Sequence, residues 1–196
     1  ILTTLCVMLA ISSCNNNHLN NQLLTADECL NHEQVDSAYH ILKNINPKGI
    51  SSTEDMALYT LLYTKNKYKK YIPVKDNSID SAISYYKQYG PAKRLAEAYN
   101  YKGMTIYFYQ NNNKKAIECL KKAEGIALKN NLDLLKQRTY ENLCIVNLGS
   151  NHNNIALKYG LKALNYSKVL KDSAGFAYDL QYIGDAYAAL DRKSVV

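Results

Sequence analysis

Residues that commonly do chemistry are present in this chain but are not grouped. The four histidines, His18, His32, His40 and His152, include no pair four residues apart and no carboxylate at ligand spacing, so the sequence predicts no metal site. The 8 glycines occur singly, which excludes a phosphate-cradling glycine loop, and there is no nucleophile elbow. We therefore expect no catalytic residue, no metal and no cofactor, and a protein that is not an enzyme.

One cysteine stands where a thiol is commonly modified. Residues 1–13 carry no charge and end in Ile11-Ser12-Ser13, directly before Cys14. An apolar run of this length is too short to span a bilayer but fits the core of a secretory signal. The residues up to Cys14 resemble the lipobox of bacterial lipoproteins, in which small residues precede a cysteine that becomes diacylated.

This resemblance implies an anchored protein. It implies a signal peptide over residues 1–14, a polar tether over 15–19, and attachment through palmitate or a similar acyl chain at Cys14. The protein would then lie at a membrane of the bacterial cell envelope, facing the periplasm or the cell surface. The plainer alternative is an apolar N-terminal helix that ends in cysteine. Cys29, Cys119 and Cys144 are not spaced as CxxC, and they are predicted to be structural thiols.

The charge balance favours anionic surroundings. There are 24 Lys and Arg against 17 Asp and Glu, a net charge of +7. The densest basic run, Lys65 to Lys75, is interleaved with Tyr68 and Tyr71, a pattern that also occurs in proteins that bind nucleic acid or lipid headgroups. We favour the interpretation that these lysines complement a helix dipole. Because an exported protein seldom meets nucleic acid, no direct nucleic-acid contact is expected.

Long helices are the elements expected to position these residues. Only 8 Gly and 3 Pro occur in 196 residues of which 47% are hydrophobic, which argues against a many-turned β fold. Apolar periodicity and turn residues, with Pro91 at the first position of a helix, predict a series of helices. Their expected ranges are 19–30, 34–45, 53–69, 77–88, 91–110, 113–129, 133–148, 152–169 and 174–190.

Small residues recur at intervals of roughly 40 residues along these helices. In the first helix of a pair they are Gly103, Cys144 and Gly184, which gives steps of 41 and 40 residues. In the second helix an alanine recurs at Ala38, Ala82, Ala116 and Ala156. Small residues let antiparallel helices approach closely, and each pair leaves an apolar flank that the next pair must cover.

These segments resemble the tetratricopeptide repeat over about residues 20–191. The resemblance implies an all-α fold over residues 20–196, a right-handed superhelical solenoid of antiparallel helix pairs with about four and a half repeats of roughly 40 residues. The steps exceed the roughly 34 residues of the consensus repeat, and Lys102 replaces the usual Leu before Gly103. The next alanine of the register would fall at residue 196, so we expect the repeat array to be truncated there and its last helix to lack a partner.

The resemblance also implies a binding surface, because the first helices of tetratricopeptide pairs line a concave groove. The corresponding residues here are Glu97, Asn100, Met104, Tyr107, Phe108, Arg138, Glu141, Ile145, Leu148, Tyr178, Gln181 and Asp185. An extended peptide or protein partner, not identified by the sequence, would lie there. The chain is thus expected to be a lipid-anchored binding scaffold. The alternative is the extracytoplasmic sensor part of a longer membrane-tethered transcriptional regulator, with a transmembrane helix and DNA-binding domain after residue 196.

Overall fold

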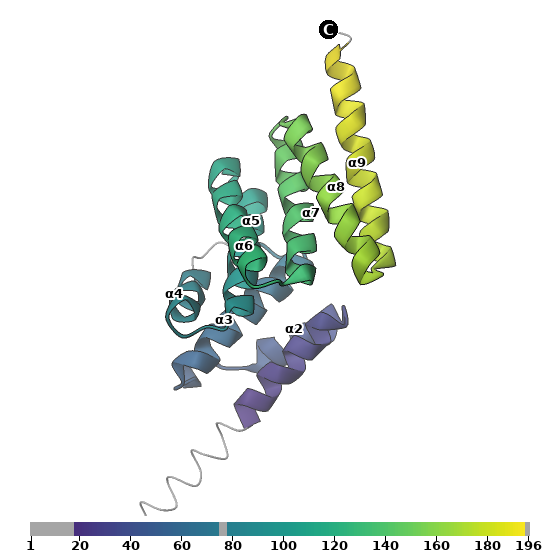
Figure 1. Ribbon diagram of the computed structural model, residues 1–196. Coiled ribbons are helices and arrows are strands. Elements are labelled where there is room, and N and C mark those ends of the chain that lie inside the picture. The colour runs from purple at the N-terminus through teal and green to yellow at the C-terminus, as the bar shows by residue number, and fades with distance from the viewer. Residues whose placement is uncertain (1–17, 75–77, 195–196) are drawn as a thin grey trace, which may run out of the picture. The chain divides into compact units, whose positions relative to one another are not determined.

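The computed structural model describes residues 18–74 and 78–194, and all regular structure within them is helical (Figure 1). The all-α fold class predicted from the sequence is confirmed. The predicted lipidation site, Cys14, lies outside the described residues. The helices are residues 18–31, α2 (Val35–Asn44), the 3-10 helix η1 (Pro47–Gly49), α3 (Thr53–Lys69), α4 (Ile79–Tyr89), α5 (Ala92–Gln110), α6 (Asn113–Lys129), α7 (Asp133–Gly149), α8 (Asn153–Leu170) and α9 (Ser173–Ser194).

The observed helix boundaries lie within two residues of the predicted ones, apart from the end of α9. That helix continues to Ser194, whereas its predicted end is residue 190. Pro91 does not occupy the first helical position, because α5 begins at Ala92 and Pro91 has an extended ψ of 154°. Residues 18 and 19 of the predicted tether are already helical.

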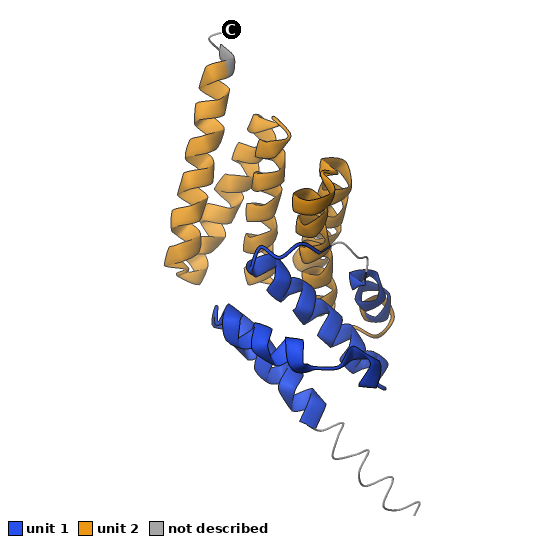
Figure 2. Ribbon diagram, turned by 180° about the vertical axis from the view of Figure 1, so that it is seen from behind, with its two compact units in different colours: residues 1–85 blue, residues 86–196 orange. Residues whose placement is uncertain are grey.

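The chain divides into two compact units, residues 1–85 and 86–196 (Figure 2). The division falls inside α4. The sequence predicts one continuous repeat domain and gives no indication of this division.

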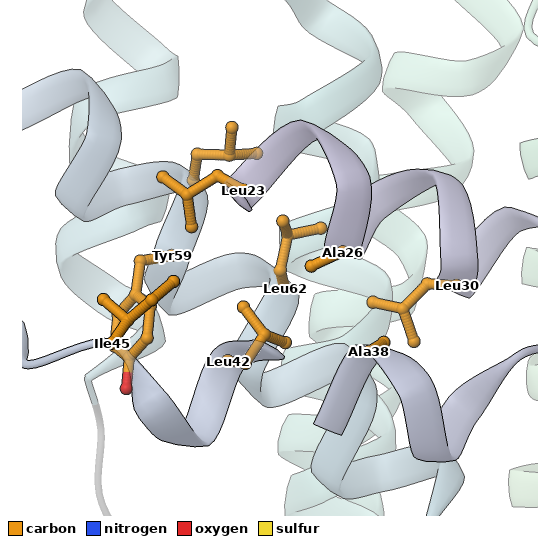
Figure 3. Close-up of a cluster of buried hydrophobic side chains, with 9 residues drawn as sticks. Leu23, Ala26, Leu30, Ala38, Leu42, Ile45, Tyr59 and Leu62 are labelled. Atoms are coloured by element: carbon orange, nitrogen blue, oxygen red, sulfur yellow. The ribbon is translucent and has the colours of Figure 1, made fainter. Parts of the chain in front are cut away.

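In the first unit, the helix over residues 18–31, α2 and α3 share one apolar core. Leu23, Leu30, Leu42 and Leu62 lie together in it, and none has exposed surface (Figure 3). Each leucine buried in this way contributes roughly 1.5–3 kcal/mol. The hydroxyl of Ser52 caps the start of α3.

The lysine run of α3 is largely engaged inside the same unit. Lys65 is fully buried, with its Nζ 3.7 Å from Asp27 Oδ1, and it donates a hydrogen bond of 3.2 Å to Asn31 Oδ1. The neighbouring ion pairs are Lys69 with Glu33 and Lys70 with Asp36. These acidic partners hold three of the lysines against the preceding part of the chain, whereas Lys75, the last lysine of the predicted run, lies outside the described residues.

In the second unit, each helix from α5 to α9 packs against the next, and α7 also contacts α5 and α9 (Figure 1). Residues in the left-handed conformation end four of these helices at 20-residue intervals. They are Asn111, Asn131, Asn151 and Lys171, with φ values of 49°, 52°, 58° and 55°. Asn tolerates this conformation better than most residues. The short turns make consecutive helices antiparallel.

Hydrogen bonds across three of these turns follow the Schellman pattern. The N–H of the residue after the left-handed position donates to a carbonyl five residues earlier, as Leu132 does to Ala127 at 3.0 Å and His152 to Asn147 at 2.9 Å. The same bond closes the turn at Lys171. The same capping motif therefore ends α6, α7 and α8 at 20-residue intervals.

The recurring small residues differ in what lies against them. A Cβ added to Gly103 would lie 2.8 Å from Leu120 Cγ on α6 and 3.1 Å from a backbone oxygen of Ala116. The recurring Cys144 lies against Gly160 of α8, where an added Cβ would lie 3.4 Å from Cys144 Sγ and 2.9 Å from Ile183 Cγ1. One added to Gly184 would meet nothing within 4 Å. Close helix packing thus requires glycine at 103 but not at the equivalent position of α9.

Candidate peptide-binding surface

The residues predicted for α7 lie on one face of that helix. Arg138, Glu141, Ile145 and Leu148 are separated by three or four residues, the spacing that places side chains on a common helical face. All four are half-buried. Each therefore keeps some surface that a ligand can contact.

The three predicted groove residues nearest the start of α5 are Glu97, Asn100 and Met104, and all three are buried. Met104 has no exposed surface, and Glu97 accepts a hydrogen bond from Arg94 Nη1 at 3.1 Å. Asn100 Oδ1 accepts one from Asn142 Nδ2 at 3.1 Å, which links α5 to α7. These side chains are enclosed by the chain itself, unlike the open groove residues that the sequence predicts. The groove positions were predicted from the tetratricopeptide resemblance, which indicates a helix face. It does not indicate how deeply a neighbouring helix covers that face.

Aromatic side chains farther along α5 and on α9 are accessible. Tyr107 is half-buried and its ring centroid lies 4.9 Å from that of Phe108, which is 47% exposed. On α9, Tyr178 is 59% exposed, and Gln181 and Asp185 are also exposed. The accessible part of the predicted surface therefore consists of the end of α5, one face of α7, and α9.

A polar cluster adjoins this surface at Glu141 and joins α7, α8 and the start of α9. Gln137 Nε2 is 3.1 Å from Glu141 Oε1 and 2.9 Å from Asp172 Oδ2. The same nitrogen is 3.1 Å from Ser167 Oγ, and that hydroxyl donates to the buried carboxylate of Asp179. An amide nitrogen has only two hydrogens. The cluster thus offers more acceptors than donors.

The surroundings shift the carboxyl groups of this cluster in opposite directions. Burial, and secondly the charge of Asp179, raises the pKa of Glu141 to about 7. Burial also raises the pKa of Asp179 to about 6. The backbone N–H of Gly175, which donates to Asp172 at 3.0 Å, lowers the pKa of Asp172. A protonated Glu141 or Asp179 would supply a donor that the cluster lacks.

Of the members of this cluster, only Glu141 was predicted from the sequence as a site residue. One signal was present in α9. Asp179 precedes Ile183 by four residues and Ala186 by seven, and both of these are buried. A carboxylate at such a core-facing position is unusual enough to mark a polar site. The partners from α7 and α8 could not be paired with it without the fold.

The cysteines of the described chain lie in helix packing and not in a reactive site. Cys119 and Cys144 are buried, Cys29 is half-buried, and burial raises the pKa of the Cys144 thiol to about 12. Within residues 18–74 and 78–194, no group of three or more His, Cys, Asp or Glu side chains could hold a metal ion. In the same part of the chain, no helix is both long and apolar enough to cross a bilayer.

Comparison with known proteins finds no matching family model, no matching curated protein and no matching solved structure.

Proposed function

We propose that this chain is a binding scaffold that holds a protein or extended peptide along α7 and α9. The observation that supports this is the contact between these two helices together with their accessible apolar side chains, Ile145 and Leu148 on α7 and Tyr178 on α9. Polar groups beside them, such as Gln181 and Asp185, would bond to the backbone of a partner. Aromatic anchors surrounded by polar residues are typical of protein-binding surfaces.

The proposed architecture of residues 86–196 is a tetratricopeptide-like solenoid of antiparallel helix pairs. Three features support it: the 20-residue spacing of the turns, the contacts of α7 with both α5 and α9, and the close packing at Gly103. Lipid attachment at Cys14 would place this scaffold at a membrane of the cell envelope, and the proposed role is binding without catalysis.

The binding proposal can be tested with two tyrosines on the same helix. Tyr178 and Tyr187 are 59% and 56% exposed, and nine residues of α-helix place them on opposite faces of α9. We expect Tyr178→Ser, combined with Ile145→Ser, to lower the recovery of membrane-extract partners on the immobilised protein by about fivefold or more, because an apolar anchor is lost. Tyr187→Ser should leave recovery unchanged. Equal recovery by the wild type, the double variant and the Tyr187→Ser control would contradict binding at the α7 and α9 surface.

A further inference from the structure

A second surface of the molecule, distinct from the α7 and α9 face, forms an open groove of about 590 Å³ in the second unit. It lies between the end of α4, the start of α5 and the second half of α6. Four exposed lysines line it: Lys87, Lys121, Lys122 and Lys129. Half-buried Leu95 and Ile126 supply apolar surface between them.

The groove carries an excess of positive charge. Among the residues that the structure describes, no carboxylate lines it. Lys121 pairs with Glu124, but no ion pair among the described residues neutralises Lys87, Lys122 or Lys129. The Nζ atoms of Lys87 and Lys122 lie 5.8 and 5.6 Å from the centre of the Tyr99 ring, so both ammonium groups are gathered over the same part of the groove. An anionic ligand would therefore be attracted to it.

A glycine keeps the groove open. Gly125 lies in the interior of α6, where glycine is less favourable than any other residue except proline. A Cβ added there would meet nothing within 4 Å, so no helix packing requires its absence. Any larger side chain at this position would project from the wall of the groove. Gly125 thus lowers the stability of α6 but leaves space for a ligand in the groove.

We propose that this groove binds an acidic peptide segment that carries apolar side chains. Its carboxylates would pair with Lys87, Lys122 and Lys129, and its apolar side chains would lie on Leu95 and Ile126. A recessed apolar surface between helices fits a peptide better than a bilayer, which presents a broad face to exposed side chains. The proposal is independent of the α7 and α9 surface, and charge complementarity with burial of apolar side chains would provide the affinity.

The test measures binding of a fluorescein-labelled peptide made of glutamates around a central Leu-Leu pair. We expect saturable binding by the whole chain that weakens as salt is added. Lys122→Gln combined with Lys129→Gln should weaken it about tenfold. Lys114→Gln combined with Lys115→Gln is the matched control, because it removes the same charge from exposed positions at the other end of α6 and should change affinity less than about twofold.

A second pair of variants separates loss of binding from loss of folding. Gly125→Leu should fill the groove and abolish binding while the helix becomes more stable, and Gly184→Leu, at an equally open helical position of α9, should leave binding intact. Three results would overturn the proposal: equal binding of a peptide with Gln in place of every Glu, unchanged affinity in the lysine variant, or binding that Gly125→Leu does not reduce. Binding to vesicles of anionic lipid but not to the peptide would also overturn it, in favour of a membrane surface.

Discussion

At the scale of single residues, the balance between burial and ionisation is most visible at Glu141. Its ordinary pKa of 4.5 is raised to about 7, mainly by burial, and that of Asp179 is raised to about 6. A carboxyl group whose pKa is higher in the folded protein binds a proton there at pH values where the unfolded chain does not. The resulting stability is fully present below the unfolded pKa and is lost as pH rises through the folded pKa.

We therefore predict that the free energy of unfolding falls by about 2–4 kcal/mol between about pH 5 and about pH 8, with the larger part from Glu141. Asp172 does not oppose this change, because its lowered pKa affects stability only at more acidic pH. Glu141→Gln should lose most of the pH dependence, since the amide is neutral throughout. Urea unfolding followed by circular dichroism at both pH values checks this. A wild type equally stable at both, or a variant with the full pH dependence, would contradict it.

A second residue-scale prediction concerns Cys14, which lies outside the described part of the chain. If the lipobox resemblance holds, a palmitate analogue fed to expressing cells should label the wild type. Cys14→Ser should be unlabelled and should leave the membrane fraction, because the acyl chains provide the proposed anchor. Label that persists on the variant would refute this modification site, whereas Cys119→Ser should keep the label and serves as the control.

At the scale of helices, Gly103 of α5 and Gly184 of α9 should respond in opposite ways to the same substitution, because their surroundings differ. Gly103→Ala should lower the free energy of unfolding by about 1–3 kcal/mol, because the new Cβ would crowd Leu120 and a backbone oxygen on α6. Gly184→Ala should raise it by about 0.5–1 kcal/mol, because alanine favours the helix and meets no neighbour. Chemical denaturation of the two variants measures both effects. A more stable Gly103→Ala variant would show that α6 does not crowd Gly103 as described, and a less stable Gly184→Ala variant would show that position 184 is not open.

The helices were the part of the structure that could be predicted from the sequence. Their boundaries follow from periodicity and from local turn residues such as Asn111, whose left-handed conformation is a property of one residue. Depth of burial depends instead on distant segments. Asn100 and Lys65 are polar residues that the sequence places at a surface, yet each is buried against a partner from another helix, Asn142 and Asp27 respectively. For the same reason, the polar cluster around Gln137 was recognised only in part.

At the scale of the whole chain, the two compact units predict partial independence. Residues 86–196 contain α5 to α9 together with the contacts among them. We expect this fragment, produced alone, to be helical and to unfold cooperatively, since each of its helices packs against the next within the same unit. Circular dichroism during thermal unfolding tests this. A fragment without a cooperative transition would show that its helices require residues 1–85.

The central claim is that the chain holds a partner on the face of α9 that contains Tyr178. The most direct measurement is photocrosslinking in cells with benzoylphenylalanine placed at position 178 or at position 187. We expect a discrete crosslinked product from position 178 and none from position 187, because the two side chains point to opposite sides of one helix. A product from position 187 with none from 178, or the same products from both, would contradict the account.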